Sequence, residues 1–144
     1  MSTTTAVVEQ LPAPSVRQLV AESVRSRHRE WMQGLLAREA EFVDPRDRVL
    51  AVFDHLEREG TSGRPHCDDD SDPDLVQEHL RQVEAHIAER CADAALPVHL
   101  GQALTLLVQG ARVGAAVHRS AQPARTARTA AAMLLAVYEG EALF

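Results

Sequence analysis

Aromatic residues are scarce in this sequence, and their scarcity narrows the fold class. They make up 3% of the 144 residues, whereas apolar residues together make up 45%, with Ala and Leu the most frequent. Strand-rich folds are built largely on β-branched and aromatic side chains, while Ala and Leu favour helix. The composition therefore predicts an all-α protein, and its length is that of one domain with a real core.

Lysine is absent as well. All 15 basic residues are Arg, and they face 21 acidic residues, which gives a formal net charge of -6. Binding to a phosphate backbone depends on clustered cations, so an acidic balance over the whole chain opposes it. The Arg residues at 17–29 are interrupted by Glu22 and followed by Glu30, and we interpret them as a solvated helix surface.

Paired cysteines and long apolar runs are also lacking. Cys67 and Cys91 form no CxxC motif, and no secretory leader is recognisable. We therefore expect a cytoplasmic protein. No apolar run, including the one at 103–108 that Thr105 interrupts, comes near the roughly 20 residues needed to cross a bilayer. We expect no interaction with a membrane.

Five segments have the apolar periodicity and the end signals of helices. They cover residues 15–40, 44–60, 72 to beyond 91, 97–118 and 123–140. Asp-Pro begins two of them, because Asp accepts an otherwise unpaired N–H while Pro at the first helical position loses no hydrogen bond. We predict a bundle of about five helices forming one domain at 15–144, after a flexible leader at 1–14.

Motifs for catalysis or metal binding are missing. There is no nucleophile elbow, phosphate-binding glycine loop, zinc helix motif or dinucleotide fingerprint, so we expect no enzyme activity, no catalytic residue and no cofactor. The segment 66–70, His-Cys-Asp-Asp-Asp, gathers five potential metal ligands. Its neighbouring side chains point in different directions and lack the spacing of a calcium or zinc site. We interpret 60–72 as an exposed, mobile acidic loop that binds no metal.

Five stretches of the chain, in order, carry the motifs of one protein family. They are Ser15–Val20 with Arg27–Trp31, Asp44–Leu56, Asp72–His79, Leu100–Ala116 and Ala124–Leu135. Together they resemble the C-terminal domain of the tetracycline-repressor (TetR) family of transcription regulators. The resemblance covers most of the chain and implies a helical domain that binds a small effector and dimerises.

In such domains the effector occupies a cavity framed by the first four helices, and its binding shifts the first helix. Candidate contacts are inward-facing positions, each of which a plain core would also explain: Trp31, Leu35, Phe53, Leu56, His79, Val83, His86 and Leu107. Their apolar character implies a small, largely hydrophobic effector. The two histidines lie seven residues apart on one helix face, and the alternative is that they are partly exposed and flank the core.

Small residues are concentrated in the last two helices. The resemblance implies that these helices meet their symmetry mates in a homodimer with a two-fold axis. The candidate interface residues are Leu107, Gly110, Ala111, Gly114, Ala127, Ala131 and Leu134. A tight helix pair within one chain is the alternative explanation.

The DNA-reading part of such a regulator is not recognisable in this sequence. Only 14 residues precede Ser15, whereas a helix-turn-helix with its lead-in helix needs roughly 30 to 40. The family usually has Lys at the position of Val16, where it approaches the DNA backbone. We therefore expect DNA binding only if a reader domain lies upstream.

Three functions remain open from the sequence. The first is a truncated regulator that binds an effector and dimerises, including with a full-length relative. The second is the sensor part of an ordinary repressor whose true start lies upstream. The third is a helical bundle without a regulatory role.

Overall fold

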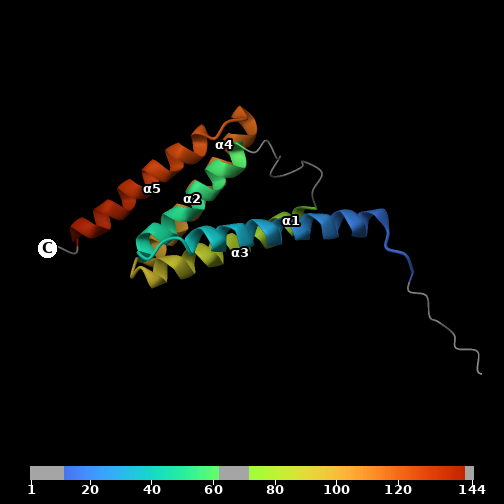
Figure 1. The fold of residues 1–144 in the computed structure, drawn as a ribbon, viewed down its shortest axis with the longest axis horizontal. Coiled ribbons are helices and arrows are strands. Elements are labelled where there is room, and N and C mark those ends of the chain that lie inside the picture. Colours follow the sequence, from blue (N-terminus) through green and yellow to red (C-terminus); the bar gives the residue numbers. More distant parts are fainter. Residues whose placement is uncertain (1–11, 62–71, 142–144) are drawn as a thin grey trace, which may run out of the picture.

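The structure, a computed structural model, describes residues 12–61 and 72–141, which form five helices and, within these ranges, no strand. The helices are α1 (Val16–Glu39), α2 (Pro45–Thr61), α3 (Pro73–Asp93), α4 (Val98–His118) and α5 (Gln122–Glu141) (Figure 1). The predicted all-α bundle is confirmed. The segments 1–11 and 62–71 lie outside the described residues, so the predictions for the leader and for His66–Asp70 remain predictions.

Capping residues explain why α1 and α3 begin where they do. Ser15 and Gln18 form a capping box at the start of α1, in which each side chain accepts from the backbone N–H of the other residue. At the start of α3 the Asp72 side chain accepts from the N–H of Asp74, and Pro73 is the first helical residue. These local signals are readable in the sequence because they need no tertiary partner.

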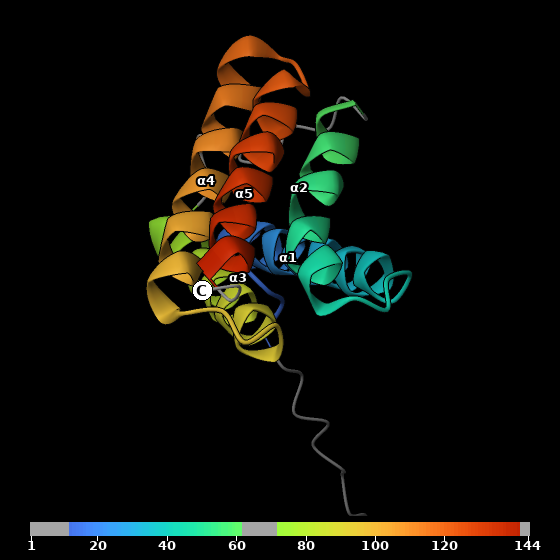
Figure 2. The same ribbon diagram turned by 90° about the vertical axis from the view of Figure 1, so that its left-hand side faces the viewer.

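The five helices form two crossing groups. Helices α4, α5 and α2 stand side by side, and α1 and α3 run across them (Figures 1 and 2). The core fills the space between the groups, and its fully buried large side chains include Leu35 of α1, Phe53 of α2, Val83 of α3 and Leu104 of α4. One apolar core joins all five helices.

Ion pairs fasten α2 to α5 along an antiparallel seam. Arg125 at the start of α5 pairs with Glu57 near the end of α2 at 2.7 Å, and Arg128 pairs with Asp54 at 3.0 Å. At the other end of the seam, Arg46 of α2 donates to the carbonyl of Leu135 at 3.1 Å. The exposed edges along which α2 meets α5 are therefore polar, while the sides of both helices that face inward belong to the core.

Helix α4 is apolar on more than one side. Its 21 residues and mean hydropathy of 1.2 would allow it to cross a membrane by length and composition alone. No long uninterrupted apolar run in the sequence marks this property of the helix. Core helices of bundles share this property, and α4 lies against α5, α3 and α2. Only 33% of its apolar window is buried, so α4 also presents apolar side chains at the surface.

The apolar stripe expected along α1 is only partly buried. Val24, Trp31 and Leu35 are buried, but Val16, Leu19 and Val20 near the start of the helix are exposed. The described part of the chain therefore covers the second half of α1 and leaves its first turns uncovered.

Candidate functional site

Polar and aromatic side chains from four helices meet around the single tryptophan of the chain. We call this group the Trp31 cluster, and its members are His28 and Trp31 of α1, His55 and Glu59 of α2, His79 of α3 and Arg112 of α4. It lies where α1 meets α2 and α3, and Arg112 reaches it from α4.

Trp31 is held by hydrogen bonds at its ring and at its backbone. Its indole Nε1 donates to Glu59 Oε2 at 3.0 Å, and its carbonyl accepts from His55 Nε2 at 3.0 Å. Gly34 makes room for the His55 ring, because a Cβ at that position would lie 2.8 Å from His55 Cε1. The sequence...Trp-x-x-Gly... thus brings α1 and α2 into close contact.

His79 lies at the centre of the cluster and is 3% exposed. Its ring stacks on His28 with a centroid distance of 4.1 Å and an interplanar angle of 15°, and it meets Trp31 edge-on at 5.3 Å. Arg112 Nη2 donates to His79 Nε2 at 3.1 Å, and the guanidinium carbon of Arg112 lies 4.3 Å from the centre of the Trp31 ring. Such a cation–π contact is stabilising in a partly desolvated site.

The surroundings favour neutral imidazoles. Burial, and then the positive charges of Arg112 and Arg27, lower the pKa of His28, while the negative charge of Glu78 acts in the opposite direction. Burial also lowers the pKa of His55, although its hydrogen bond to the Trp31 carbonyl opposes that effect. Both shifts favour the neutral form of the ring.

A second buried polar group joins the end of α1 to α3. His86 Nε2 contacts both carboxylate oxygens of Glu39, and Oε2 lies at 3.0 Å. Arg90 approaches the same Oε2 at 3.8 Å. Glu39 is 5% exposed and His86 is 9% exposed, so this is a buried polar contact rather than a surface contact.

The interior position of His79 and His86 confirms that they share the inward face of α3, and the alternative of partly exposed flanking residues is wrong. They do not, however, form one site. Seven residues separate them by about 10 Å along a helix, and each has its own partners: His28 and Arg112 for His79, and Glu39 for His86.

The apolar candidates for effector contacts have a different setting. Leu35, Phe53, Leu56 and Val83 are buried in the continuous core. They line none of the hollows that we describe in this part of the chain, which all lie along α4 and α5. Within the described residues, these four side chains act as core.

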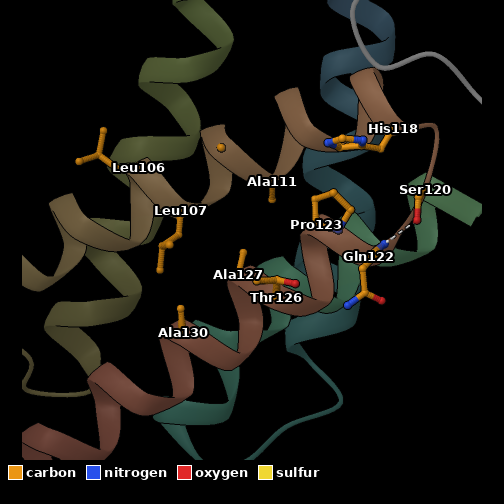
Figure 3. A pocket seen from close by; sticks show the side chains of 11 residues that line it. Leu106, Leu107, Ala111, His118, Ser120, Gln122, Pro123, Thr126, Ala127 and Ala130 are labelled. Carbon is orange, nitrogen blue, oxygen red and sulfur yellow. Dashed lines mark hydrogen bonds between the residues drawn. The ribbon is translucent and has the colours of Figure 1, made fainter.

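Leu107 faces the outside groove between α4 and α5 rather than the interior framed by the first four helices. It projects from α4 toward Ala127 and Ala130 of α5, while Leu106 points away from α5 (Figure 3). One hollow of about 390 Å³ lies beside the α4–α5 turn, and another of about 610 Å³ continues along the groove past Met133 and Val137. Its place makes Leu107 a candidate for the interface and not for the effector pocket.

The small residues predicted for the interface divide into two groups. Ala111, Ala127 and Ala131 are buried between the helices of one chain, so the tight intramolecular pair explains them and they are not free for a partner. Gly114 also belongs to the packing within one chain, because a Cβ there would lie 2.9 Å from Pro123 Cβ.

The remaining interface candidates lie along the groove. Gly110 lines the hollow beside the turn, and nothing would lie within 4 Å of an added Cβ at this position. Leu134 is partly buried, and it lines the longer hollow together with Leu107.

An exposed apolar surface on α4 and α5 was missed by the sequence analysis. On α4 it consists of Leu106, Val113 and Val117, and on α5 of Met133 and Val137, all more than half exposed. On α4 these positions are seven and four residues apart, and on α5 they are four residues apart, so each helix carries one exposed apolar stripe. We call these five residues the outer apolar face.

No family model, curated protein or solved structure matches this chain. Among the described residues, no group of three His, Cys, Asp or Glu side chains could hold a metal ion. What the Trp31 cluster offers chemically is therefore hydrogen bonding, aromatic stacking and proton uptake.

Proposed function

We propose that this chain is the effector-binding and dimerisation domain of a TetR-like transcription regulator. The observation that carries the proposal is the outer apolar face on α4 and α5, the two helices that the resemblance assigns to dimerisation. The order and length of the five helices also agree with the resemblance.

The outer apolar face has the properties of a helix–helix interface. Leu106 is 68% exposed, Val113 65% and Met133 67%, which is costly for large apolar side chains grouped on one surface. Two neighbouring antiparallel helices on one chain, packed on the same two helices of a second chain, bury both stripes in a four-helix arrangement. A closed two-fold dimer follows, because the same surface is used by both chains.

The Trp31 cluster is the place where we expect the effector to act. It brings an aromatic ring and several hydrogen-bonding groups to the place where α1 meets α2 and α3, and a ligand there contacts α1 directly. A small, largely hydrophobic molecule with one polar group fits this combination of a large ring and few polar atoms. Its binding would shift α1, which in a complete regulator leads toward the DNA-reading domain.

A helical dimer without an effector is the second candidate function, because Leu35, Phe53 and Val83 are fully buried in one continuous apolar core. Fluorescence of the single tryptophan separates the two candidates. An effector bound at the cluster changes the Trp31 emission and stabilises the fold against heat. The Trp31→Phe substitution weakens this stabilisation by the effector. If a broad panel of small hydrophobic molecules changes neither property, the second candidate is correct.

Dimerisation itself is tested by the molar mass in solution. Leu106→Asp places a charge in the outer apolar face and should convert a dimer into a monomer. Val43→Asp is the matched control, because Val43 is 92% exposed in the connection between α1 and α2 and is not part of the outer apolar face. A wild-type chain that is monomeric at concentrations of tens of micromolar, or a Leu106→Asp variant that stays dimeric, would contradict the proposal.

A further inference from the structure

We infer that His28, His79 and Arg112 form an acid-released contact that holds the first half of α1 against α3 and α4. This inference does not depend on the proposed effector or on dimerisation. It rests on the ring stacking, the direction of one hydrogen bond and the charges that surround the two imidazoles.

The direction of the Arg112–His79 hydrogen bond requires a neutral His79. A guanidinium group has only donors, so the Nε2 atom of His79, 3.1 Å from Arg112 Nη2, must act as the acceptor. A protonated imidazole has N–H donors on both nitrogens and accepts nothing. Proton uptake therefore turns this hydrogen bond into a contact between two donors of the same charge.

The stacking of His28 on His79 adds a second penalty. The ring centroids are 4.1 Å apart, so protonation of both rings would place two positive charges face to face. Arg112 and Arg27 already bring positive charge to His28, and only Glu78 opposes them among the groups that act on its ring. The first proton taken up by the pair therefore disfavours the folded contact, and the second disfavours it further.

The two hydrogen bonds that hold Trp31 do not respond to protons in this way. His55 donates from Nε2 to the Trp31 carbonyl, and it still donates when protonated. Glu59 accepts from the Trp31 indole, which has no lone pair to protonate. The acid response is thus confined to the side of α1 that faces α3 and α4.

The consequence is a local release of α1 rather than unfolding of the bundle. Before His28, only Val24 is buried among the residues of α1, and Val16, Leu19 and Val20 are exposed. After Trp31, Leu35 and Glu39 remain fixed in the core and at His86. Loss of the His28–His79–Arg112 contact therefore frees the helix from Val16 to about His28, while the rest of α1 stays in place.

The sign of the effect follows from the lowered pKa of His28. Because the released state has the more ordinary pKa, near 6.5, it binds more protons than the closed state when the pH falls below that value. The contact is therefore fully present above about pH 7 and is lost progressively below about pH 6.5.

Hydrogen–deuterium exchange of the full chain tests the inference. Between pH 7.5 and 5.5, after correction for the intrinsic pH dependence of exchange, residues 16–28 should lose protection several-fold, because the stacked His28 ring no longer holds this segment against α3. Residues 98–108 of α4 should keep their protection, which distinguishes local release from global unfolding.

Two variants make the test specific. His79→Gln keeps an acceptor oxygen for Arg112 but has no imidazole to protonate, and it should abolish the loss of protection at residues 16–28. His28→Phe keeps a stacked ring without a titrating nitrogen and should reduce the loss. His118→Gln, at an exposed site at the end of α4, should leave the wild-type response unchanged.

Three outcomes would overturn the inference. The first is a wild-type segment 16–28 whose corrected protection is equal at both pH values. The second is an acid response in His79→Gln that equals the wild-type response. The third, which applies if His79→Gln fails to fold by circular dichroism at pH 7.5, is a full wild-type response in His28→Phe.

Discussion

Replacement of His86 provides the sharpest test of how the end of α1 is held. In the native chain, His86 contacts both oxygens of Glu39, a carboxylate that is 5% exposed and lies in the last turn of α1. The negative end of the helix dipole disfavours a carboxylate at this position, so Glu39 depends on its partners. His86→Ala leaves Arg90 at 3.8 Å, and Arg90 also pairs with Glu89 and Asp93.

The expected magnitude follows from leaving one partner of a buried pair behind. Removing one member of such a pair costs about 3–5 kcal/mol, and we expect about 3 kcal/mol for His86→Ala because Arg90 retains part of the interaction. Replacing both members, by Glu39→Leu with His86→Leu, leaves no buried charge and should cost less than about 1 kcal/mol. The paired change is therefore milder than the single one.

Urea unfolding at pH 7.5 and one fixed protein concentration measures these free energies. His118→Ala is the control, since an exposed histidine should change the free energy of unfolding by less than about 0.5 kcal/mol. The reasoning is refuted if His86→Ala behaves like this control, or if the double replacement is as destabilising as the single one.

The remaining predictions concern the core and two close helix contacts. Phe53→Ala removes a fully buried ring and should lower the free energy of unfolding by about 3–5 kcal/mol in the same urea assay; a loss below about 1 kcal/mol would show that the core is loosely packed. Gly34→Ala places a Cβ 2.8 Å from His55 Cε1 and should cost about 1–3 kcal/mol and change the Trp31 fluorescence, whereas unchanged emission would contradict the close α1–α2 contact. Gly114→Ala meets Pro123 at 2.9 Å and should also destabilise the chain, while a gain in thermal stability would show that the α4–α5 turn yields easily.

The helices and their ends were predictable from the sequence because their signals are local. Ser15 with Gln18 and Asp72 with Pro73 cap helices through neighbours within three residues, and both starts are found where expected. The inward face of α2, with Val52 and Phe53, follows from helical periodicity in the same way.

The contacts between helices were less predictable, because helical periodicity identifies the apolar face of a helix but not the helix that packs against it. Ala111 and Ala131 were expected at a dimer interface, yet they face each other's helices within one chain. Helix α4 is apolar on several sides, so periodicity alone does not separate its core-facing residues, such as Leu104, from exposed Leu106.

The Trp31 cluster shows the same limit for the candidate site. Trp31 and His79 were selected as inward-facing residues, but His28 and Arg112 were not. Both are polar residues, and the apolar pattern of their helices does not mark them as inward-facing. Their meeting depends on how α1 and α3 pack together and on the reach of Arg112 from α4, which no local pattern encodes. The exposed apolar positions of α4, such as Leu106 and Val113, are visible in the sequence, but nothing local marks them as exposed.

Chemical cross-linking between two chains tests the central claim most directly, because it asks whether the outer apolar face of one chain lies against that of another. In a Cys67→Ser background, in which Cys91 is buried, Met133→Cys places a thiol on this face and Val43→Cys places one outside it, in the connection between α1 and α2. A short bifunctional maleimide should join two Met133→Cys chains in high yield and leave Val43→Cys monomeric, with both variants folded by circular dichroism. Equal yields for the two variants, or efficient cross-linking through Val43→Cys alone, would contradict dimerisation through α4 and α5.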